Sequence, residues 1–402
     1  MNRSLSTYTS ASIIRLCVIT FLFFSANSIL NIIVPLRSET EGASNAEIGI
    51  MMGSYMMTSM LCRPWAGSIV HRFGPLLVLR TLLIANVVIL ALYPISGLEW
   101  YFAIRAMQGV TTAFFSLALQ MGIVDTLPEK ERSQGISLYL LAGMLPTLIG
   151  PLAALSIWNW GGMSAFTAAM IIIGFATIIV GYNAPLSSAS NKPEGEKVQE
   201  PMLTQIRQLR TNRAFLVCGT AMLVASISFG AVISFITLYS KESGVGDAGI
   251  YLTLQAGVIV LSRYTLRKKI PSDGNWHARL VAGLLLCTGV GVQLLALAAF
   301  NGALFMYAGA VMLGLGMALL YPILVTYLTF VLPVASRNMA IGLFIATSDF
   351  GVVLGSVVMG PVADLLSYSA MYTVCACISL VAVVTVLASG RRLSYLNARR
   401  RE

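Results

Sequence analysis

Three charged side chains lie inside segments that are otherwise apolar: Arg63, Arg105 and Asp349. A charge in hydrocarbon is costly and normally faces a helix-bundle interior or a water-filled cavity, so it marks a binding site or an ion pathway. A guanidinium can hold an anionic group through paired hydrogen bonds. Desolvation favours the protonated form of a carboxylate, which suits a group that gains a proton on one side and loses it on the other. The pattern predicts substrate binding by Arg63 and Arg105, and proton coupling by Asp349 with Arg105.

Each of these residues also has a structural interpretation. Arg105 could be a buried arginine satisfied by helix carbonyls. Arg63 lies close enough to a helix end to snorkel or to pair at a gate. Asp349 could be tied to a neighbouring hydroxyl such as that of Ser348.

Asn27, Asn31 and Gln255 are polar residues on helices expected to face inward. Asn27 and Asn31 are four residues apart and therefore share a helix face. These amides either line a substrate cavity or form hydrogen bonds between helices.

The chain lacks the motifs of catalysis. It has no GxxxxGK[ST] sequence for ATP and no HExxH sequence, and His71 and His277 are its two histidines. The six cysteines all fall in apolar segments, where they are expected to be small packing residues. We therefore expect no enzyme, no catalytic residue, no cofactor and no metal site.

The composition is that of a membrane protein. Apolar residues make up 57% of the 402 and charged residues 10%, with a mean hydropathy of +0.81. Backbone groups in lipid must be satisfied within their own segment, so an all-α integral membrane protein is expected. Runs of about 20 apolar residues predict twelve transmembrane helices at 14–36, 47–69, 76–97, 101–123, 135–157, 162–182, 214–238, 248–266, 278–299, 303–327, 338–362 and 367–389.

The distribution of basic residues predicts the orientation. With a cytoplasmic amino terminus, only Arg37 and Lys241 of the 26 Lys and Arg residues fall outside, and Arg63 and Arg105 fall within spans. Because Lys and Arg accumulate in cytoplasmic loops, both termini are expected to be cytoplasmic. Attraction of these basic loops to anionic lipid also explains the net charge of +10. Because the charge is scattered over loops and forms no single basic patch, a nucleic-acid partner is not expected.

The chain is internally duplicated. An offset of 205 aligns LPEKERSQGISLY (127–139) with LPVASRNMAIGLF (332–344), and RAMQG (105–109) with AVMLG (310–314). An offset of 210 aligns GPLAAL (150–155) with GPVADL (360–365), and one of 200 aligns Gly49, Ile50 and Arg63 with Gly249, Ile250 and Arg263. We expect six-helix bundles at 1–182 and 214–402, joined by a polar linker at 183–213 whose end forms an amphipathic helix. Parallel repeats of this kind predict a rocking transporter with its site at the interface of the repeats.

Several motifs resemble those of the major facilitator superfamily. GSIVHRFGP (67–75) resembles its cytoplasmic loop signature, with His71 in place of the usual Asp, and RAMQG (105–109) resembles its RxxQG signature. GMLPTLIGP (143–151) matches part of the signature of its exporters and antiporters, although Ala153 and Ala154 replace expected glycines. The resemblance implies a role for Gln108 at the cavity and for Gly67, His71, Arg72, Gly74, Gly150 and Pro151 in gating. His71 is otherwise a solvated loop residue or a pH sensor.

Other segments resemble the exporters of staphylopine-type opine metallophores: LFFSANSILNIIVPLR (22–37), RPWAG (63–67), the sequence of 105–141, IPSDGNWH (270–277) and FVLPVASRNMAIGLFIATSDFG (330–351). The resemblance implies proton-driven export of a metal-free, amphoteric and carboxylate-rich metallophore by a monomer in the bacterial plasma membrane. A multidrug/proton antiporter is the alternative. A receptor or scaffold that uses the same fold without transport is the third possibility.

Overall fold

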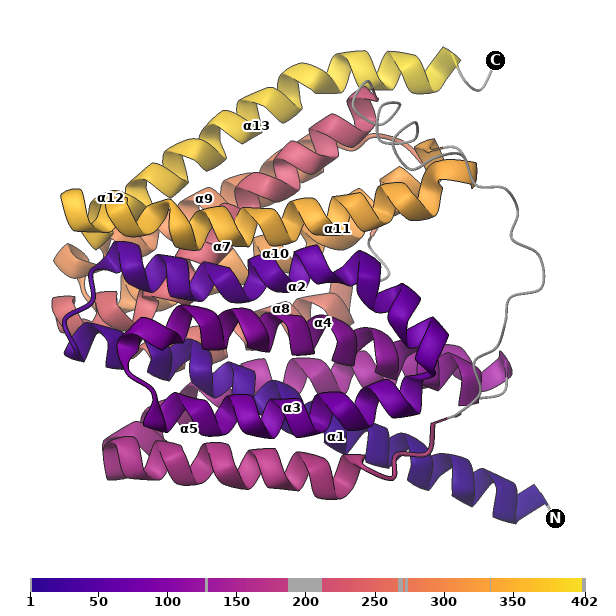
Figure 1. Ribbon diagram of the computed structural model, residues 1–402. Helices are drawn as coiled ribbons and strands as arrows, with labels where there is room; N and C mark the ends of the chain where they lie inside the picture. Colours follow the sequence, from indigo (N-terminus) through magenta and orange to yellow (C-terminus); the bar gives the residue numbers. More distant parts are fainter. Residues whose placement is uncertain are drawn as a thin grey trace. The chain divides into compact units, whose positions relative to one another are not determined.

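A computed structural model describes residues 2–126, 129–186, 212–266, 270–271, 274–332 and 334–399. These residues form helices joined by short loops, and no strand occurs among them. The first six elements are α1 (Asn2–Thr40), α2 (Asn45–Phe73), α3 (Pro75–Ile95), the 3-10 helix η1 (Leu98–Trp100), α4 (Tyr101–Thr126) and α5 (Glu129–Gly181). The others are α7 (Arg213–Ser243), α8 (Ala248–Leu266), α9 (Ala278–Asn301), α10 (Ala303–Val331), α11 (Val334–Val357), α12 (Met359–Leu365) and α13 (Tyr368–Arg399) (Figure 1).

Local sequence sets several helix ends. Gly74 has φ +82°, and Pro75 then starts α3 at the position where a missing N–H costs nothing. Asn212 caps α7, because its side chain accepts a hydrogen bond from Phe215 N at 3.1 Å. The same helix ends at Gly244, whose φ of +65° is the left-handed conformation that favours glycine.

The expected spans all fall on helices. Nine helical stretches in the described part of the chain are long and apolar enough to cross a membrane. One of them is α5, which holds the expected spans 135–157 and 162–182 with a break at Gly162 (φ 52°, ψ −131°). The expected spans 47–69 and 248–266 form α2 and α8, which are not among the nine, so the number twelve stays a prediction. The span 338–362 is interrupted after Val357, where α11 ends.

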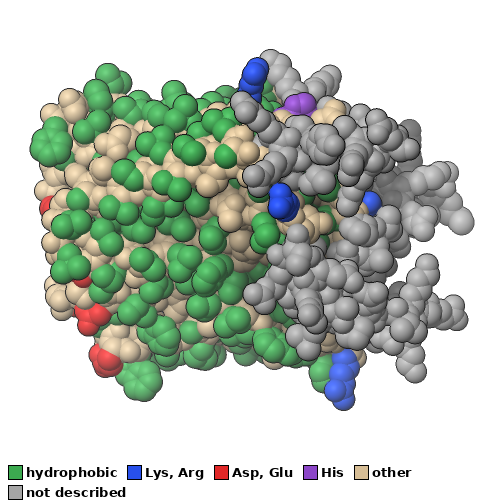
Figure 2. All heavy atoms as spheres, turned by 90° about the horizontal axis from the view of Figure 1, so that it is seen from above, with side chains coloured by type: hydrophobic (Ala, Val, Ile, Leu, Met, Phe, Trp, Pro, Cys, Tyr) green, Lys and Arg blue, Asp and Glu red, His purple; other side chains and the backbone are tan. Residues whose placement is uncertain are grey.

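The surface is consistent with a bilayer. Figure 2 shows a face covered mainly by hydrophobic side chains, with acidic groups at one edge and basic groups and a histidine toward the other. Large exposed apolar residues such as Ile172, Ile179, Phe300 and Val384 are 65 to 81% exposed. Such exposure would be unfavourable in water and is expected where side chains face lipid tails.

The chain divides into two compact units. Unit 1 comprises residues 1–43 and 50–193, and unit 2 comprises 44–49 and 194–402. The first turn of α2 thus groups with unit 2, whereas the rest of that helix belongs to unit 1. Most of the expected linker, including the stretch expected to form an amphipathic helix, lies outside the described residues.

Unit 1 is a helix bundle in which α1 runs along α5, and α3 contacts both α4 and α5. Its core contains Phe23 of α1 and Phe115 of α4, whose rings stack with centroids 3.8 Å apart. This apolar layer lies between helices that carry few polar groups, so packing fixes their rotation and hence the direction of the polar side chains they do carry.

Unit 2 is organised around α9, which packs between α10 and α13, while α7 runs along α11. Tyr239 of α7 joins α9 twice: its hydroxyl donates to Leu295 O at 2.8 Å and accepts from Ala299 N at 2.9 Å. Helix α8 contacts α10.

Candidate functional site

Arg105 of α4 is completely buried in unit 1, with none of its surface exposed. Its Nη2 donates to Asn31 Oδ1 at 2.6 Å and to Met52 Sδ at 3.2 Å. Its Nη1 donates to Gln108 Oε1 at 3.0 Å and, in a longer contact of 3.4 Å, to Asn27 Oδ1. Side chains of α1, α2 and α4 therefore converge on one guanidinium.

A second set of contacts orients these partners. Arg105 lies over the ring of Tyr55, 5.2 Å from its centroid, in the geometry of a cation–π contact. Asn27 Nδ2 donates to the hydroxyl of Tyr55 at 2.9 Å. The hydroxyl of Tyr93 on α3 donates to Gln108 Oε1 at 2.8 Å. We call the following residues the Arg105 cluster: Asn27, Asn31, Met52, Tyr55, Tyr93, Arg105 and Gln108.

A close approach between α4 and α2 brings the cluster together. A Cβ at Gly109 would collide with the carbonyl oxygen of Tyr55 and the hydroxyl of Thr58. Thr58 Oγ1 in turn donates to Ala106 O at 2.8 Å, which joins the two backbones. Only a residue without a side chain permits this contact, and so glycine follows Gln108 in the RAMQG motif.

The cluster leaves the positive charge of Arg105 uncompensated. All partners of this side chain in the described part of the chain are neutral, and its Nε has none. The interpretation in which helix carbonyls satisfy Arg105 is wrong, because its partners are side-chain oxygens and a sulfur. Burying a charge without a counterion is unfavourable, and a guanidinium is well suited to binding a carboxylate through two hydrogen bonds. The arrangement can therefore recognise an anionic group.

Arg63 lies apart from this cluster. It is exposed and follows Tyr55 by eight residues on α2, or about 12 Å along the helix axis. It interacts electrostatically with Tyr139 of α5. Its contact with substrate stays a prediction.

The residues of the predicted gate lie at the end of α2. Arg72 is exposed and its guanidinium lies over the ring of Phe73, 5.4 Å from the centroid. His71 is half-buried, and Gly74 supplies the positive φ of the turn into α3. A Cβ at Gly67 would meet no atom of the described residues within 4 Å, so no close helix contact is seen at this glycine in that part of the chain.

Gly150 and Pro151 lie on α5 where it packs against α1. A Cβ at Gly150 would collide with the hydroxyl of Ser28, which donates to Pro146 O at 2.8 Å. This glycine therefore sets the spacing between α1 and α5, next to the turn of α1 that carries Asn27 and Asn31.

Unit 2 holds the other predicted residues. Gln255 of α8 is 2% exposed, and its Nε2 has no partner in the part of the chain that the structure describes. Asp349 of α11 is half-buried. Ser348, proposed above as its partner, is hydrogen-bonded to Ser226 of α7 at 3.0 Å.

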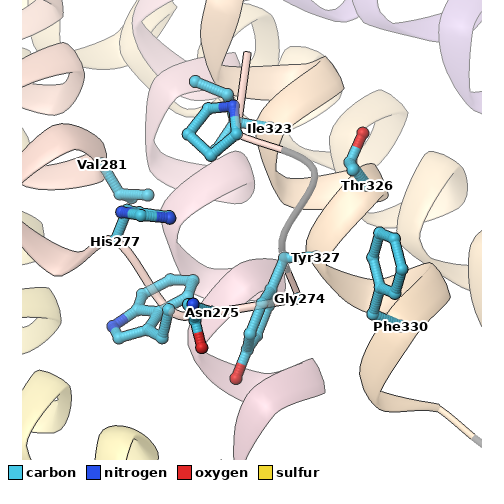
Figure 3. Close-up of a pocket in the computed structure, with 10 residues that line it drawn as sticks. Gly274, Asn275, His277, Val281, Ile323, Thr326, Tyr327 and Phe330 are labelled. Carbon is cyan, nitrogen blue, oxygen red and sulfur yellow. The ribbon is translucent and has the colours of Figure 1, made fainter.

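The IPSDGNWH segment has a packing role in unit 2. Its residues 272 and 273 lie outside the described part. The indole of Trp276 is buried against the ring of Tyr327, with centroids 4.9 Å apart. Gly274, Asn275 and His277 face Thr326 and Phe330 of α10 across a cavity of about 10 Å³ (Figure 3), which has room for about one water molecule. The described part of the segment therefore packs at the start of α9, and the cavity that it lines is too small for an organic substrate.

Met52, Tyr55 and Tyr93 are members of the Arg105 cluster that the sequence analysis missed. Met52 and Tyr55 are three residues apart, so they share a helix face, and this spacing was the available signal. Nothing in the sequence showed that this face meets α1 and α4. Tyr93 lies next to Pro94, near the end of its span. Tyrosine is common there because its amphipathic ring favours the membrane–water interface, so the sequence carried no sign of a role in the cluster.

Long apolar helices packed around a buried cation indicate a polytopic membrane protein with an internal site for an anion. The sequence pattern of the Major Facilitator Superfamily matches residues 16–287 and 272–400. The chain belongs to this family.

Two relatives illustrate the place of this chain in the family. The chain is 45% identical over 375 residues to the Staphylopine export protein of Staphylococcus aureus (strain Mu50 / ATCC 700699), and the alignment covers 92% of this chain and 94% of that one. It is 25% identical over 175 residues to an uncharacterized MFS-type transporter of Pseudomonas aeruginosa (strain UCBPP-PA14), covering 43% and 42%. The first of these confirms the resemblance to staphylopine exporters.

Solved structures share the fold. A mutant of the nucleoside transporter NupG superposes with a TM-score of 0.77 at 14% identity, over 94% of this chain and 99% of that one. A bacterial homolog of the human lysosomal transporter Spinster, in an inward-facing and occupied conformation, gives 0.72 at 14% identity, over 98% and 97%.

Proposed function

We propose that this chain exports a staphylopine-type metallophore, in its metal-free form, across the bacterial plasma membrane. The observation that carries the proposal is the 45% identity to a staphylopine export protein over 92% of the chain. An opine metallophore carries several carboxylates and amines, so its transporter needs a site for anionic groups within the membrane. The Arg105 cluster has the required chemistry.

The electrostatics favour this substrate over a cationic drug. A lipophilic cation entering unit 1 would meet Arg105, whose partners among the described residues are all neutral. Like charges in a medium of low dielectric constant repel strongly. A substrate carboxylate would instead replace one amide partner and gain two charge-assisted hydrogen bonds. The multidrug alternative is therefore less well supported.

The proposed mechanism is alternating access driven by proton antiport, with a monomer as the working unit and both termini in the cytoplasm. Asp349 takes up and releases the proton, and Arg105 responds to it or binds substrate. Arg63 and the amides of Asn27, Asn31 and Gln255 contact the substrate. Gly67, His71, Arg72 and Gly74 act at the inner gate, and Gly150 with Pro151 holds α5 against α1.

Secretion tests the proposal directly. Deletion of the gene should lower the extracellular metallophore and raise the intracellular pool, both measured by mass spectrometry of medium and cells. The wild-type gene should restore secretion, and a gene encoding Arg105→Ala should not. Unchanged secretion in a strain without a second exporter would contradict the proposal. Sensitivity to lipophilic cations in the deletion strain, with normal secretion, would favour the multidrug alternative.

A further inference from the structure

The repeat that aligns GPLAAL (150–155) with GPVADL (360–365) contains one change of charge. Ala154 in the first copy is fully buried and apolar, and its counterpart in the second copy is Asp364. The carboxylate of Asp364 serves neither the Arg105 cluster nor the proton site proposed above.

Asp364 binds the start of α2. Its Oδ1 accepts a hydrogen bond from Asn45 N at 2.9 Å, and its Oδ2 accepts one from Ala46 N at 2.8 Å. These are the first backbone amides of a 29-residue helix, where free N–H groups and the helix dipole favour a negative charge. The carboxylate thus caps a helix more than 300 residues away in the sequence.

The start of α2 already has a cap of its own. Ser44 N donates to Glu47 Oε2 at 2.8 Å, and Glu47 N donates to Ser44 Oγ at 3.2 Å, which together form a capping box. Helix formation at this point does not require Asp364. Its contribution is to hold the helix end against α12.

Glycines and a tyrosine extend the contact. A Cβ at Gly360 would collide with the carbonyl oxygen of Asn45, and one at Gly49 would collide with that of Ser356. The hydroxyl of Tyr368 donates to Asn45 Oδ1 at 2.5 Å. We call the contact made by Asn45, Ala46, Gly49, Ser356, Gly360, Asp364 and Tyr368 the α2 latch. All of it lies within unit 2, and beyond Gly49 the same helix belongs to unit 1.

A latch made of hydrogen bonds at a helix end can open and close. A few charge-assisted bonds at an aqueous boundary exchange readily with water, unlike an interdigitated apolar interface. In the topology proposed above, the latch lies on the outer side, where an exporter must release its substrate.

We propose that Asp364 is a positioning residue of the transport cycle, which holds the first turn of α2 against α12 in one state and releases it in another. The role of Asp364 in a transport cycle rests on the proposed function, but opening of the α2 latch can be tested without any substrate. Asp247 supplies the matched control. It also caps a helix in unit 2, because its Oδ1 accepts from Ile250 N at 2.9 Å, but it caps the start of its own helix.

Cysteine labelling reports on opening. Ile48 is completely buried, so Ile48→Cys, in a chain whose six native cysteines are replaced, should react slowly with a membrane-impermeant maleimide. Adding Asp364→Asn should raise the labelling rate about tenfold, the factor that about 1.4 kcal/mol of lost stabilisation represents. Adding Asp247→Asn should leave the rate unchanged. Equal rates in all three proteins, or equal increases with both substitutions, would overturn the proposal.

A cross-link then tests whether opening is needed for transport. The pair Ala46→Cys and Asp364→Cys replaces the hydrogen-bonded contact between these two residues with a reducible disulfide. Oxidation should stop export of the metallophore. Reduction should return export to the rate of the Asp364→Cys protein, which also lacks the carboxylate, and oxidant should not affect either single-cysteine protein. Full export by the cross-linked protein, or failure of the pair to cross-link, would overturn the proposal. If no form of the protein exports the metallophore, the proposed function fails while the labelling result still decides whether the latch opens.

Discussion

The helix pair α4 and α2 in unit 1 and the pair α10 and α8 in unit 2 share one packing contact but differ in charge. A Cβ at Gly109 would collide with Tyr55 O, and one at Gly314 would lie 2.9 Å from Gln255 O. The repeats align Gly109 with Gly314 and Tyr55 with Gln255, so the same glycine-to-carbonyl approach occurs in both copies.

Beside this contact, the two copies carry different side chains. Arg105 in unit 1 and its counterpart Ala310 in unit 2 are both fully buried. The duplicated unit has thus kept the backbone geometry that brings the two helices together and placed a charge in only one copy. Backbone contact and binding chemistry are therefore separable, and substitutions can test each of them.

Arg105→Ala makes unit 1 resemble unit 2 and should have the largest effect. Hydrogen bonds to charged groups contribute about 1.5–3 kcal/mol each, so loss of a paired contact should reduce metallophore transport by about 100-fold or more. Arg105→Lys should also be impaired, since an ammonium cannot reproduce the paired geometry. Flux in proteoliposomes is the measurement, with membrane insertion checked for each variant. Arg15→Ala, which removes a guanidinium bonded to Val180 O at 2.7 Å, controls for loss of helix packing away from the cluster. Wild-type flux in Arg105→Ala would show that the residue is structural.

Asp349→Asn tests the carboxylate of unit 2. The amide keeps the shape and much of the hydrogen bonding of a protonated acid, so downhill counterflow should survive while export driven by a pH gradient is lost. Flux with and without an imposed gradient distinguishes the two. A variant that still responds fully to the gradient would place proton coupling elsewhere, with His71 or the Arg105 region as the next candidates.

Asn31→Asp gives Arg105 a counterion within unit 1 and so tests whether the substrate binds to this guanidinium. The new carboxylate would lie where Asn31 Oδ1 now accepts at 2.6 Å, and it would compete with the substrate for the guanidinium. We expect KM to rise about tenfold, equivalent to about 1.4 kcal/mol, with a smaller change in the maximal rate. Asn301→Asp, at an exposed position, adds the same charge away from the cluster. An unchanged KM in Asn31→Asp would argue against substrate binding at Arg105.

Gly109→Ala and Gly314→Ala test the shared contact. Each added methyl would press on a backbone carbonyl, so both should lower stability by about 1–3 kcal/mol, measured by thermal unfolding in detergent. Only Gly109→Ala should also weaken transport, because it displaces Tyr55 from Arg105. Gly283→Ala is the control, since this glycine has no proposed role and a Cβ there would meet no described atom within 4 Å. Stability loss at one glycine but not the other would break the correspondence between the two helix pairs.

The sequence predicted the helices well, because a span in lipid requires only a long apolar run and its own backbone hydrogen bonds. The family was predicted for a different reason. Motifs such as RAMQG and the loop at 67–75 resemble signatures that are specific to the family. Both predictions are confirmed by the structure and by the family match. Asn27 and Asn31 could be placed on one face because a helix has a fixed period.

What the sequence could not supply was the rotation of one helix against another. Tyr55 and Tyr93 contact the Arg105 cluster because α2 and α3 turn particular faces toward α4, and that depends on packing over their whole lengths. The same limit explains why the hydrogen bond between Ser348 and Ser226 was not expected. The roles of the site residues stay predictions.

The break in α5 at Gly162 bears on how the chain enters the membrane. Two expected spans meet at this residue, whose left-handed φ of 52° is one that a side chain would strain. The sequence before it, Trp158-Asn-Trp160-Gly161, supplies two tryptophans of the kind found at membrane boundaries, and Trp160 is 88% exposed. A joint this short contains no charged loop that must be carried across the bilayer during synthesis. We therefore expect residues 135–182 to be inserted by the translocation machinery as one helical hairpin, so that a charge introduced at this joint would impair biogenesis rather than transport.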